Sequence, residues 1–318
     1  MLIGWLVAAG VGVAAIVWGA GTFARHLAVA STRLGVSAFA LAVLLAGAEP
    51  EELATSVTAS LRHSPGIALG DVIGANVAIC LVALGVGAVL APLPFDRQVR
   101  RYALAGLPAG ALAAAIAWDG SVTRAEGAVL VATYVAFVAA IWILERHPPA
   151  LGETAELDDV SHPHAGTSAG RVGRELVLVV AGVAAMAIGA SALVEGVRRI
   201  SNVEATQTRL GLVVVGFATA FELVVLAWSS ARRGISAAVV AGVVGSFTYN
   251  VTMTLGAGAL ARPLRVLDAT QLRRPSLFMI GALALVLALA LPTGRLSRRA
   301  GIVCLVSYAV FVVVSLTM

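Results

Sequence analysis

The chain has 318 residues, of which 59% are hydrophobic and only 12% are charged, and its mean hydropathy is +0.95. A soluble domain carries about 25% charged residues, so this composition excludes a soluble globular protein and indicates a surface that faces lipid. All 22 basic residues are arginines, which lie in short clusters between apolar runs. Such clusters are typical of the ends of membrane helices, and we therefore predict a lipid-bilayer protein that binds no nucleic acid.

The apolar runs predict an all-α fold, that of a polytopic membrane protein with about ten transmembrane helices. A membrane helix needs about 20 predominantly apolar residues, and arginine, proline and glycine separate runs of that length along the whole chain. In chain order, the predicted spans are 2–23, 34–61, 66–91, 99–118, 125–144, 174–197, 207–231, 235–260, 276–291 and 300–317.

A polar stretch at 145–173 divides the chain into residues 1–144 and 174–318, each with five predicted spans. Two halves with an odd number of spans must cross the membrane in opposite directions. The sequence therefore predicts two inverted five-helix repeats, an arrangement typical of transporters whose binding site lies at the bilayer midplane between the halves. The polar stretch contains acids and histidines, and either a regulatory cation site or a solvated linker fits its composition.

The distribution of arginines predicts the orientation. Loops after odd-numbered spans hold about 13 arginines and loops after even-numbered spans about 9, and positive loops stay in the cytoplasm. We therefore expect an N-terminus outside the cell and a cytoplasmic loop at 145–173. The absence of lysine and the abundance of alanine, glycine and valine favour a GC-rich bacterial genome, and hence the inner (plasma) membrane.

The two halves share a pattern around one glutamate each. Glu52 lies in a long apolar run and is followed by leucine, a short arginine turn and then Gly74, 22 residues on (74 − 52 = 22). Glu222 is followed by the same features and by Gly245, 23 residues on (245 − 222 = 23). A matched feature in two halves is the best sequence indication of a transporter's binding site.

An ionised side chain at mid-membrane costs at least about 2.5–3.5 kcal/mol, so Glu52 and Glu222 predict a cation or proton site. The competing interpretation is a protonated carboxylic acid that is hydrogen-bonded within the bundle. In the first repeat, Glu49 and Glu52 share a helix face whereas Glu51 points elsewhere. Pro50 is expected to break this span, so that a half-helix begins at the proline.

The oxygen-rich side chains near these glutamates suit a hard cation such as Ca²⁺, which takes 6–8 oxygens. No soft ligand lies nearby, which argues against copper or a thiolate zinc site. We interpret Asp71, which follows Gly70, as a helix-start residue rather than a ligand. The candidate ligands are Glu52, Glu222, Glu49, Thr219, Ser246 and Asn250.

No catalytic motif accompanies this set: the sequence contains no zinc-protease HExxH, no nucleophile elbow and no phosphate loop. We therefore predict that the chain is not an enzyme and has no cofactor, with inorganic cations as its substrates.

At these residues the sequence resembles the sodium/calcium exchanger (calcium:cation antiporter, CaCA) superfamily. That family carries two inverted repeats, each with a Gly-Thr-Ser-Leu/Ala-Pro-Glu-Leu segment followed by a Gly-Ser-Asn-x-x-Asn segment. Glu52 and Glu222 take the positions of the family's ion-binding glutamates, and Thr219 takes that of a serine. The positions that match the second segment are Gly74, Asn76, Gly245, Ser246 and Asn250.

The chain departs from this pattern mainly in its first repeat, where hydroxyl and amide ligands are lost and a carboxylate is gained at Glu49. The departures are Ala48, Glu49, Pro50, Glu51, Ala75 and Ile79 in the first repeat, and Phe221 and Phe247 in the second. The resemblance implies an antiporter that exports Ca²⁺ in exchange for Na⁺ or H⁺ by alternating access, with Glu52 and Glu222 facing each other at the midplane. Alternatives are an antiporter for K⁺, Mg²⁺ or Mn²⁺, and a non-transporting cation sensor that retains the fold.

Overall fold

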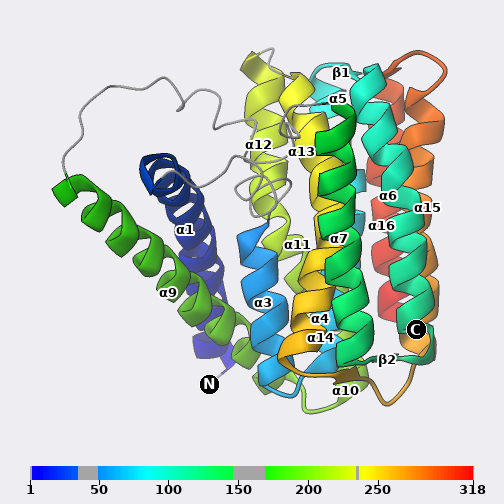
Figure 1. Cartoon of the computed structure of the whole chain (residues 1–318). Coiled ribbons are helices and arrows are strands. Elements are labelled where there is room, and N and C mark those ends of the chain that lie inside the picture. Colours follow the sequence, from blue (N-terminus) through cyan, green and yellow to red (C-terminus); the bar gives the residue numbers. More distant parts are fainter. Residues whose placement is uncertain (1, 35–48, 146–168, 234–235, 318) are drawn as a thin grey trace.

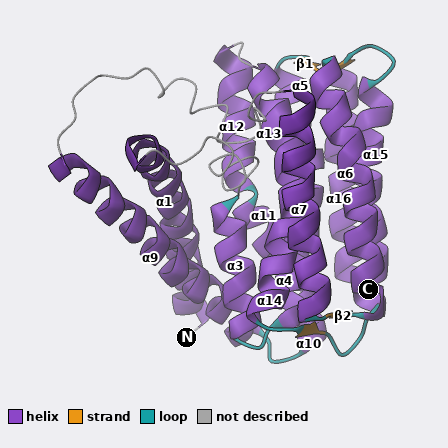
Figure 2. Ribbon diagram, in the orientation of Figure 1, coloured by secondary structure: helices purple, strands orange, loops and turns teal. Residues whose placement is uncertain are grey.

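The computed structural model describes residues 2–34, 49–145, 169–233 and 236–317, and almost all of them are helical (Figure 1, Figure 2). The first half of the chain contains α1 (Leu2–Leu34), α3 (Pro50–Leu61), α4 (Pro65–Ala78), the π-helix η1 (Ile79–Ala83), α5 (Leu84–Leu90), β1 (Leu93–Pro94), α6 (Arg97–Ile116), the 3₁₀-helix η2 (Ala117–Asp119), β2 (Ser121–Val122) and α7 (Arg124–Glu145).

The second half contains elements of the same kinds in a similar order. These are α9 (Ala169–Ile200), α10 (Glu204–Leu210), the π-helix η3 (Gly211–Val215), α11 (Gly216–Thr219), α12 (Phe221–Arg233), α13 (Ser236–Tyr249), the π-helix η4 (Asn250–Thr254), α14 (Leu255–Ala261), β3 (Leu264–Arg265), α15 (Thr270–Ala290), β4 (Arg295–Leu296) and α16 (Arg298–Thr317).

Eight helical segments of the described residues are long and apolar enough to cross a membrane. They correspond to eight of the predicted spans. The predicted span 34–61 is described only from residue 49 onward, and the predicted span 235–260 corresponds to the helical run α13–η4–α14. The prediction of an all-α, polytopic membrane protein is confirmed. The polar stretch at 145–173 falls mostly outside the described residues.

The first helices of the two halves run antiparallel, which is the direct sign of an inverted repeat. A Cβ atom on Gly12 would lie 2.7 Å from the carbonyl oxygen of Gly189, and one on Gly19 would lie 2.7 Å from that of Gly182. The residue number rises along α1 as it falls along α9, so the two helices point in opposite directions. Glycine permits this close backbone approach, as is common between membrane helices. The α1–α9 pair lies to one side of the remaining helices (Figure 1).

Two short antiparallel ladders link the halves at opposite ends of the bundle (Figure 2). β1, which follows α5, pairs with β4 in the α15–α16 connection. β3, which follows α14, pairs with β2 in the α6–α7 connection. In each half, the strand that follows the third span pairs with the strand between the last two helices of the other half. The two halves are therefore linked in the same way at both ends of the bundle.

Glycine contacts repeat the same exchange within the membrane. A Cβ atom on Gly301 of α16 would lie 2.7 Å from the Gly85 carbonyl oxygen of α5, and one on Gly256 of α14 would lie 2.7 Å from the Gly127 carbonyl oxygen of α7. In each case the last helix of one half packs against the third span of the other. The two-fold relation between the halves therefore extends from the ladders into the helix packing.

Both second spans are interrupted beside their glutamate. α3 begins at Pro50, as predicted, and Glu49 precedes it with φ −116° and ψ 81°, outside helical values. In the second half α11 ends at Thr219, and α12 begins at Phe221 with Glu222 in its first turn. Proline is well placed at the first position of a helix because it lacks an N–H. The interruption in the second half is milder, because Ala220 keeps right-handed helical angles (φ −70°, ψ −7°), and it involves no proline.

Candidate cation site between the repeats

The site is built where α4 of the first half meets α10, η3 and α11 of the second. Gly66, Gly70 and Gly74 recur every four residues and so lie on one face of α4. A Cβ atom on Gly74 would lie 2.0 Å from the Leu212 carbonyl oxygen, and one on Gly216 would lie 2.5 Å from the backbone nitrogen of Ala75. Only glycine permits this separation, which brings Asp71 of α4 against Thr219 of α11.

The first half supplies buried acids. Glu49, Glu51 and Glu52 are exposed by 5%, 2% and 0%, respectively. The Glu49 and Glu51 carboxyl groups interact with each other, and Glu49 also accepts a hydrogen bond from the Ser246 hydroxyl of α13. Neither carboxyl oxygen of Glu52 has a hydrogen-bond partner among the described residues.

The burial of Glu51 corrects the expectation that this side chain points away from Glu49. That expectation treated residues 49–52 as one helix, in which neighbouring positions face different ways. Glu49 lies before the first turn of α3, and its backbone is outside helical values. Its side chain therefore does not follow the helical face, and it interacts with Glu51 as well as with Glu52.

Asp71 also differs from its predicted role. It lies in the interior of α4, which begins at Pro65, and it is exposed by 0%. Its Oδ1 accepts a hydrogen bond of 3.0 Å from the Thr219 hydroxyl, whereas Oδ2 has no partner within the described ranges. Asp71 is thus a site residue and not a helix-start residue. Its position in the apolar run that contains Gly66, Gly70 and Gly74 was the available signal.

The second half supplies hydroxyl and amide groups. Thr219, Ser246 and Asn250 are all buried, with exposures of 2%, 0% and 0%. The Asn250 amide oxygen accepts a hydrogen bond of 3.3 Å from the Thr254 hydroxyl. The sequence analysis missed three further buried hydroxyl residues on α13 and η4, which are Thr248, Thr252 and Thr254.

Glu222 is only half-buried, and its charge lies within electrostatic reach of Glu49 and Glu51. Glu52 lies within electrostatic reach of Asp71, Glu51 and Glu49. The direct pairing of Glu52 with Glu222 across the midplane stays a prediction.

The site concentrates negative charge in a low-dielectric interior. The ion pairs of the described residues involve the carboxylates of Glu175 and Glu195, so no basic side chain neutralises the four buried acids of the first half. Carboxylates in such a place repel one another and need a cation or a proton. In this conformation no three acidic, histidine or cysteine side chains of the described part converge as in a metal chelate. The acids instead lie in a row at the contact between the halves.

Interlocked inverted halves with charged groups between them define a membrane transporter of the inverted-repeat class. A family model described as "Sodium/calcium exchanger protein" matches residues 4–143 and 174–317. The chain belongs to this family, which confirms the resemblance to the calcium:cation antiporters and the prediction of a transporter rather than an enzyme. Cation antiport is therefore the activity of the class of transporters to which this chain belongs.

Three similar proteins can be compared with the chain. The sodium/calcium exchanger MaX1 of Methanosarcina acetivorans is 25% identical over 337 residues, which cover 95% of this chain and 96% of that protein. An uncharacterized membrane protein of Methanocaldococcus jannaschii is 26% identical over 245 residues, or 77% and 75% of the two chains. A solved structure of the sodium-calcium exchanger NCX_Mj has a TM-score of 0.60 at 22% identity, with 98% of each chain covered. The last comparison shows a shared fold.

Proposed function

We propose that this protein exports Ca²⁺ from the cytoplasm in exchange for Na⁺ or H⁺, through a midplane site that includes Glu52 and Glu222. The observation that carries the proposal is the set of four buried acids without a basic partner in the described structure: Glu49, Glu51, Glu52 and Asp71. Such a set is costly in a membrane unless cations occupy it. The names of MaX1 and NCX_Mj support the choice of sodium and calcium.

The two halves contribute different kinds of oxygen ligand. Carboxylates of the first half supply the charge that a divalent cation needs, and hydroxyl and amide oxygens of the second half complete its shell. The Ser246 hydroxyl holds Glu49, and the Thr219 hydroxyl holds Asp71, so the second half orients two acids of the first. A movement of one half relative to the other would therefore change the site itself, as alternating access requires.

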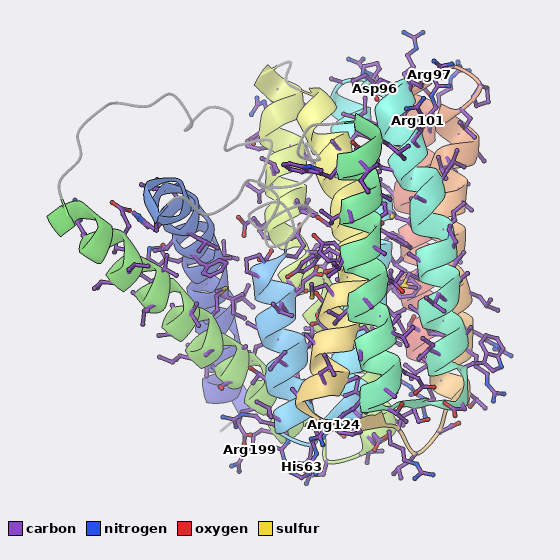
Figure 3. The ribbon with its side chains drawn as sticks, viewed as in Figure 1. His63, Asp96, Arg97, Arg101, Arg124 and Arg199 are labelled. Atoms are coloured by element: carbon purple, nitrogen blue, oxygen red, sulfur yellow. The ribbon has the colours of Figure 1, made fainter. Side chains whose placement is uncertain are left out.

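We propose an orientation in a bacterial inner membrane with the N-terminus outside and 145–173 in the cytoplasm. Arg97 and Arg101 lie at the end of the bundle that carries β1, whereas Arg124 and Arg199 lie at the opposite end, on the side of the N-terminus (Figure 3). α7, which precedes the polar stretch, runs from the β2 end of the bundle to the β1 end (Figure 1). The excess of arginines predicted for the loops on this side supports its assignment to the cytoplasm.

The test is Ca²⁺ flux in proteoliposomes that contain the full chain, with sodium and proton gradients imposed separately. Wild type should move Ca²⁺ under at least one gradient, and Glu52→Gln and Glu222→Gln should each lower the rate by about 100-fold or more, because removal of a charged ligand costs about 3 kcal/mol. Glu126→Gln is the matched control, since that carboxylate accepts hydrogen bonds from Thr123 at the start of α7. The control should transport like wild type.

Absence of Ca²⁺ flux under both gradients, in a folded preparation, would contradict calcium exchange. Flux of K⁺, Mg²⁺ or Mn²⁺ in the same vesicles would then identify another cation as substrate. Binding of Ca²⁺ without flux of any cation would instead establish a sensor that retains the fold.

A further inference from the structure

We propose that Arg124 and Arg298 are positioning residues of the third spans. Each of them begins the last helix of one half, and its guanidinium holds the C-terminal end of the third span of the other half. We call these two contacts the arginine clamps. Their effect on the candidate ligands rests on the proposed cation site, whereas the contacts themselves do not.

Each clamp is a hydrogen bond between the two halves. Nη2 of Arg298 donates to the carbonyl oxygen of Leu90, the last residue of α5, over 3.3 Å. Nε of Arg124 donates to the carbonyl oxygen of Leu260, next to the last residue of α14, over 3.2 Å. The last carbonyl groups of a helix have no partner within it, and the helix dipole places partial negative charge there. A guanidinium therefore suits both positions.

The two clamps occupy equivalent positions of the two repeats. Residues 120–127 read Gly-Ser-Val-Thr-Arg-Ala-Glu-Gly, and residues 294–301 read Gly-Arg-Leu-Ser-Arg-Arg-Ala-Gly. The first glycine of each segment has a positive φ, 81° at Gly120 and 67° at Gly294, and the clamping arginine is the fifth residue. The arginine therefore recurs at the same place in both halves, although the charges beside it differ.

Each clamp lies between two other contacts that join the halves. The strand before the arginine, β2 or β4, pairs with the strand that follows the third span of the other half. The glycine three residues after it, Gly127 or Gly301, packs against the backbone of that third span. The ladder, the clamp and the glycine contact together fix the rotation and the axial position of the end of the span.

A π-helix lies between each clamped end and the site residues of the span. η4 (Asn250–Thr254) separates the end of α14 from Ser246, and η1 (Ile79–Ala83) separates the end of α5 from Asp71. A change from π-helical to α-helical hydrogen bonding would rotate the clamped end against the site residues by about 100°. Because the clamp opposes this rotation, it keeps the site residues turned toward the other half.

The effect of each clamp is expected to be local. Arg124 and Arg298 are both exposed, so neither bond contributes much to the stability of the whole chain. The end of a helix opens more readily than its middle, and a lost end contact increases that opening. The expected signature is crossed: a substitution in one half should loosen the third span of the other.

The test follows hydrogen–deuterium exchange of backbone amides at 84–91 and 255–262 in the purified full chain. Arg298→Gln should accelerate exchange at 84–91 by about fivefold, as expected for loss of one exposed hydrogen bond from a charged group, and should leave 255–262 within about twofold. Arg124→Gln should show the reverse. Arg299→Gln is the matched control, because Arg299 is exposed beside Arg298 and its guanidinium makes no hydrogen bond to the described residues.

A second measurement tests the placement of the ligands. The half-saturating CaCl₂ concentration, measured by titration calorimetry, should rise by about threefold or more in Arg124→Gln, whose clamp holds the span that carries Ser246 and Asn250. Arg274→Gln, at an exposed position near the start of α15, should keep the wild-type value.

Unchanged exchange in the opposite third span of both variants would overturn the inference, as would equal acceleration of both segments, which general destabilisation produces. Crossed exchange with an unchanged half-saturating calcium concentration would overturn the positioning role. Crossed exchange in a wild type that neither binds nor moves Ca²⁺ would support the clamps and contradict the calcium proposal. If one of the two variants does not fold, the other decides, because each clamp has its own segment.

Discussion

The two halves share a backbone plan but carry different chemistry in the site. The first half contributes four buried acids, and the second half contributes mainly hydroxyl and amide groups on α11, α13 and η4, with Glu222 as its one acid near the site among the described residues. Interruptions beside the glutamates, π-helices in the third spans and exchanged strands recur in both halves. The two halves therefore share a backbone arrangement without carrying the same candidate ligand side chains.

The difference teaches that the site is complementary between the halves rather than duplicated. Ser246 bonds to Glu49 and Thr219 bonds to Asp71, so each acid is held by a hydroxyl of the opposite half. The first half has Ala75 where the exchanger pattern has a hydroxyl residue, and it carries the additional buried carboxyl groups of Glu49 and Glu51.

The largest effect is expected where the two halves touch. Gly74→Ala would place a Cβ atom 2.0 Å from the Leu212 carbonyl oxygen, so the backbones must separate. We expect a loss of about 3 kcal/mol or more of unfolding free energy, at the upper end of overpacking effects. Thermal unfolding in detergent measures it, with Gly281→Ala as control because its Cβ would meet nothing within 4 Å. Equal stability of the two variants would refute the close approach of the halves.

A smaller effect is expected from removal of one complementary hydroxyl. Ser246→Ala would leave Glu49 without its hydroxyl donor from α13, at a cost of about 1.5–3 kcal/mol for a hydrogen bond to a charged group. Apparent Ca²⁺ affinity should fall by roughly tenfold or more, measured by calorimetry. Thr133→Ala is the control, since that hydroxyl bonds to Val129 of its own helix at an exposed position. Wild-type affinity in Ser246→Ala would show that the halves do not complement each other at this contact.

The smallest expected effect concerns the access of water to the positions of Glu222 and Glu52. In a background with Cys80→Ala and Cys304→Ala, Glu222→Cys should react with a charged thiol reagent several-fold faster than Glu52→Cys, because Glu222 is half-buried and Glu52 is fully buried. The reaction rate in membrane vesicles without added cation measures this. Equal rates would show that the full burial of Glu52 does not limit the access of water to this position.

The sequence predicted the third spans and the start of α3, and the structure shows why. Pro50 cannot continue a helix, so the start of α3 followed from one residue. The break before Glu222 carries no such residue, and sequence alone did not locate it. Helical face counting failed at Glu51 because the backbone of Glu49, directly before the proline, is not helical. The interpretation of Asp71 failed because its role depends on Thr219, 148 residues away.

By itself the sequence determined the membrane environment, the helical fold and the family, because hydropathy, charge and residue spacing are local properties of the chain. Only the tertiary structure decided which acids meet. The contacts of Asp71 with Thr219 and of Glu49 with Ser246 depend on how closely the two halves approach. That distance is set by backbone contacts at Gly74 and Gly216, where the absence of a side chain on one half is matched to a carbonyl or an amide of the other.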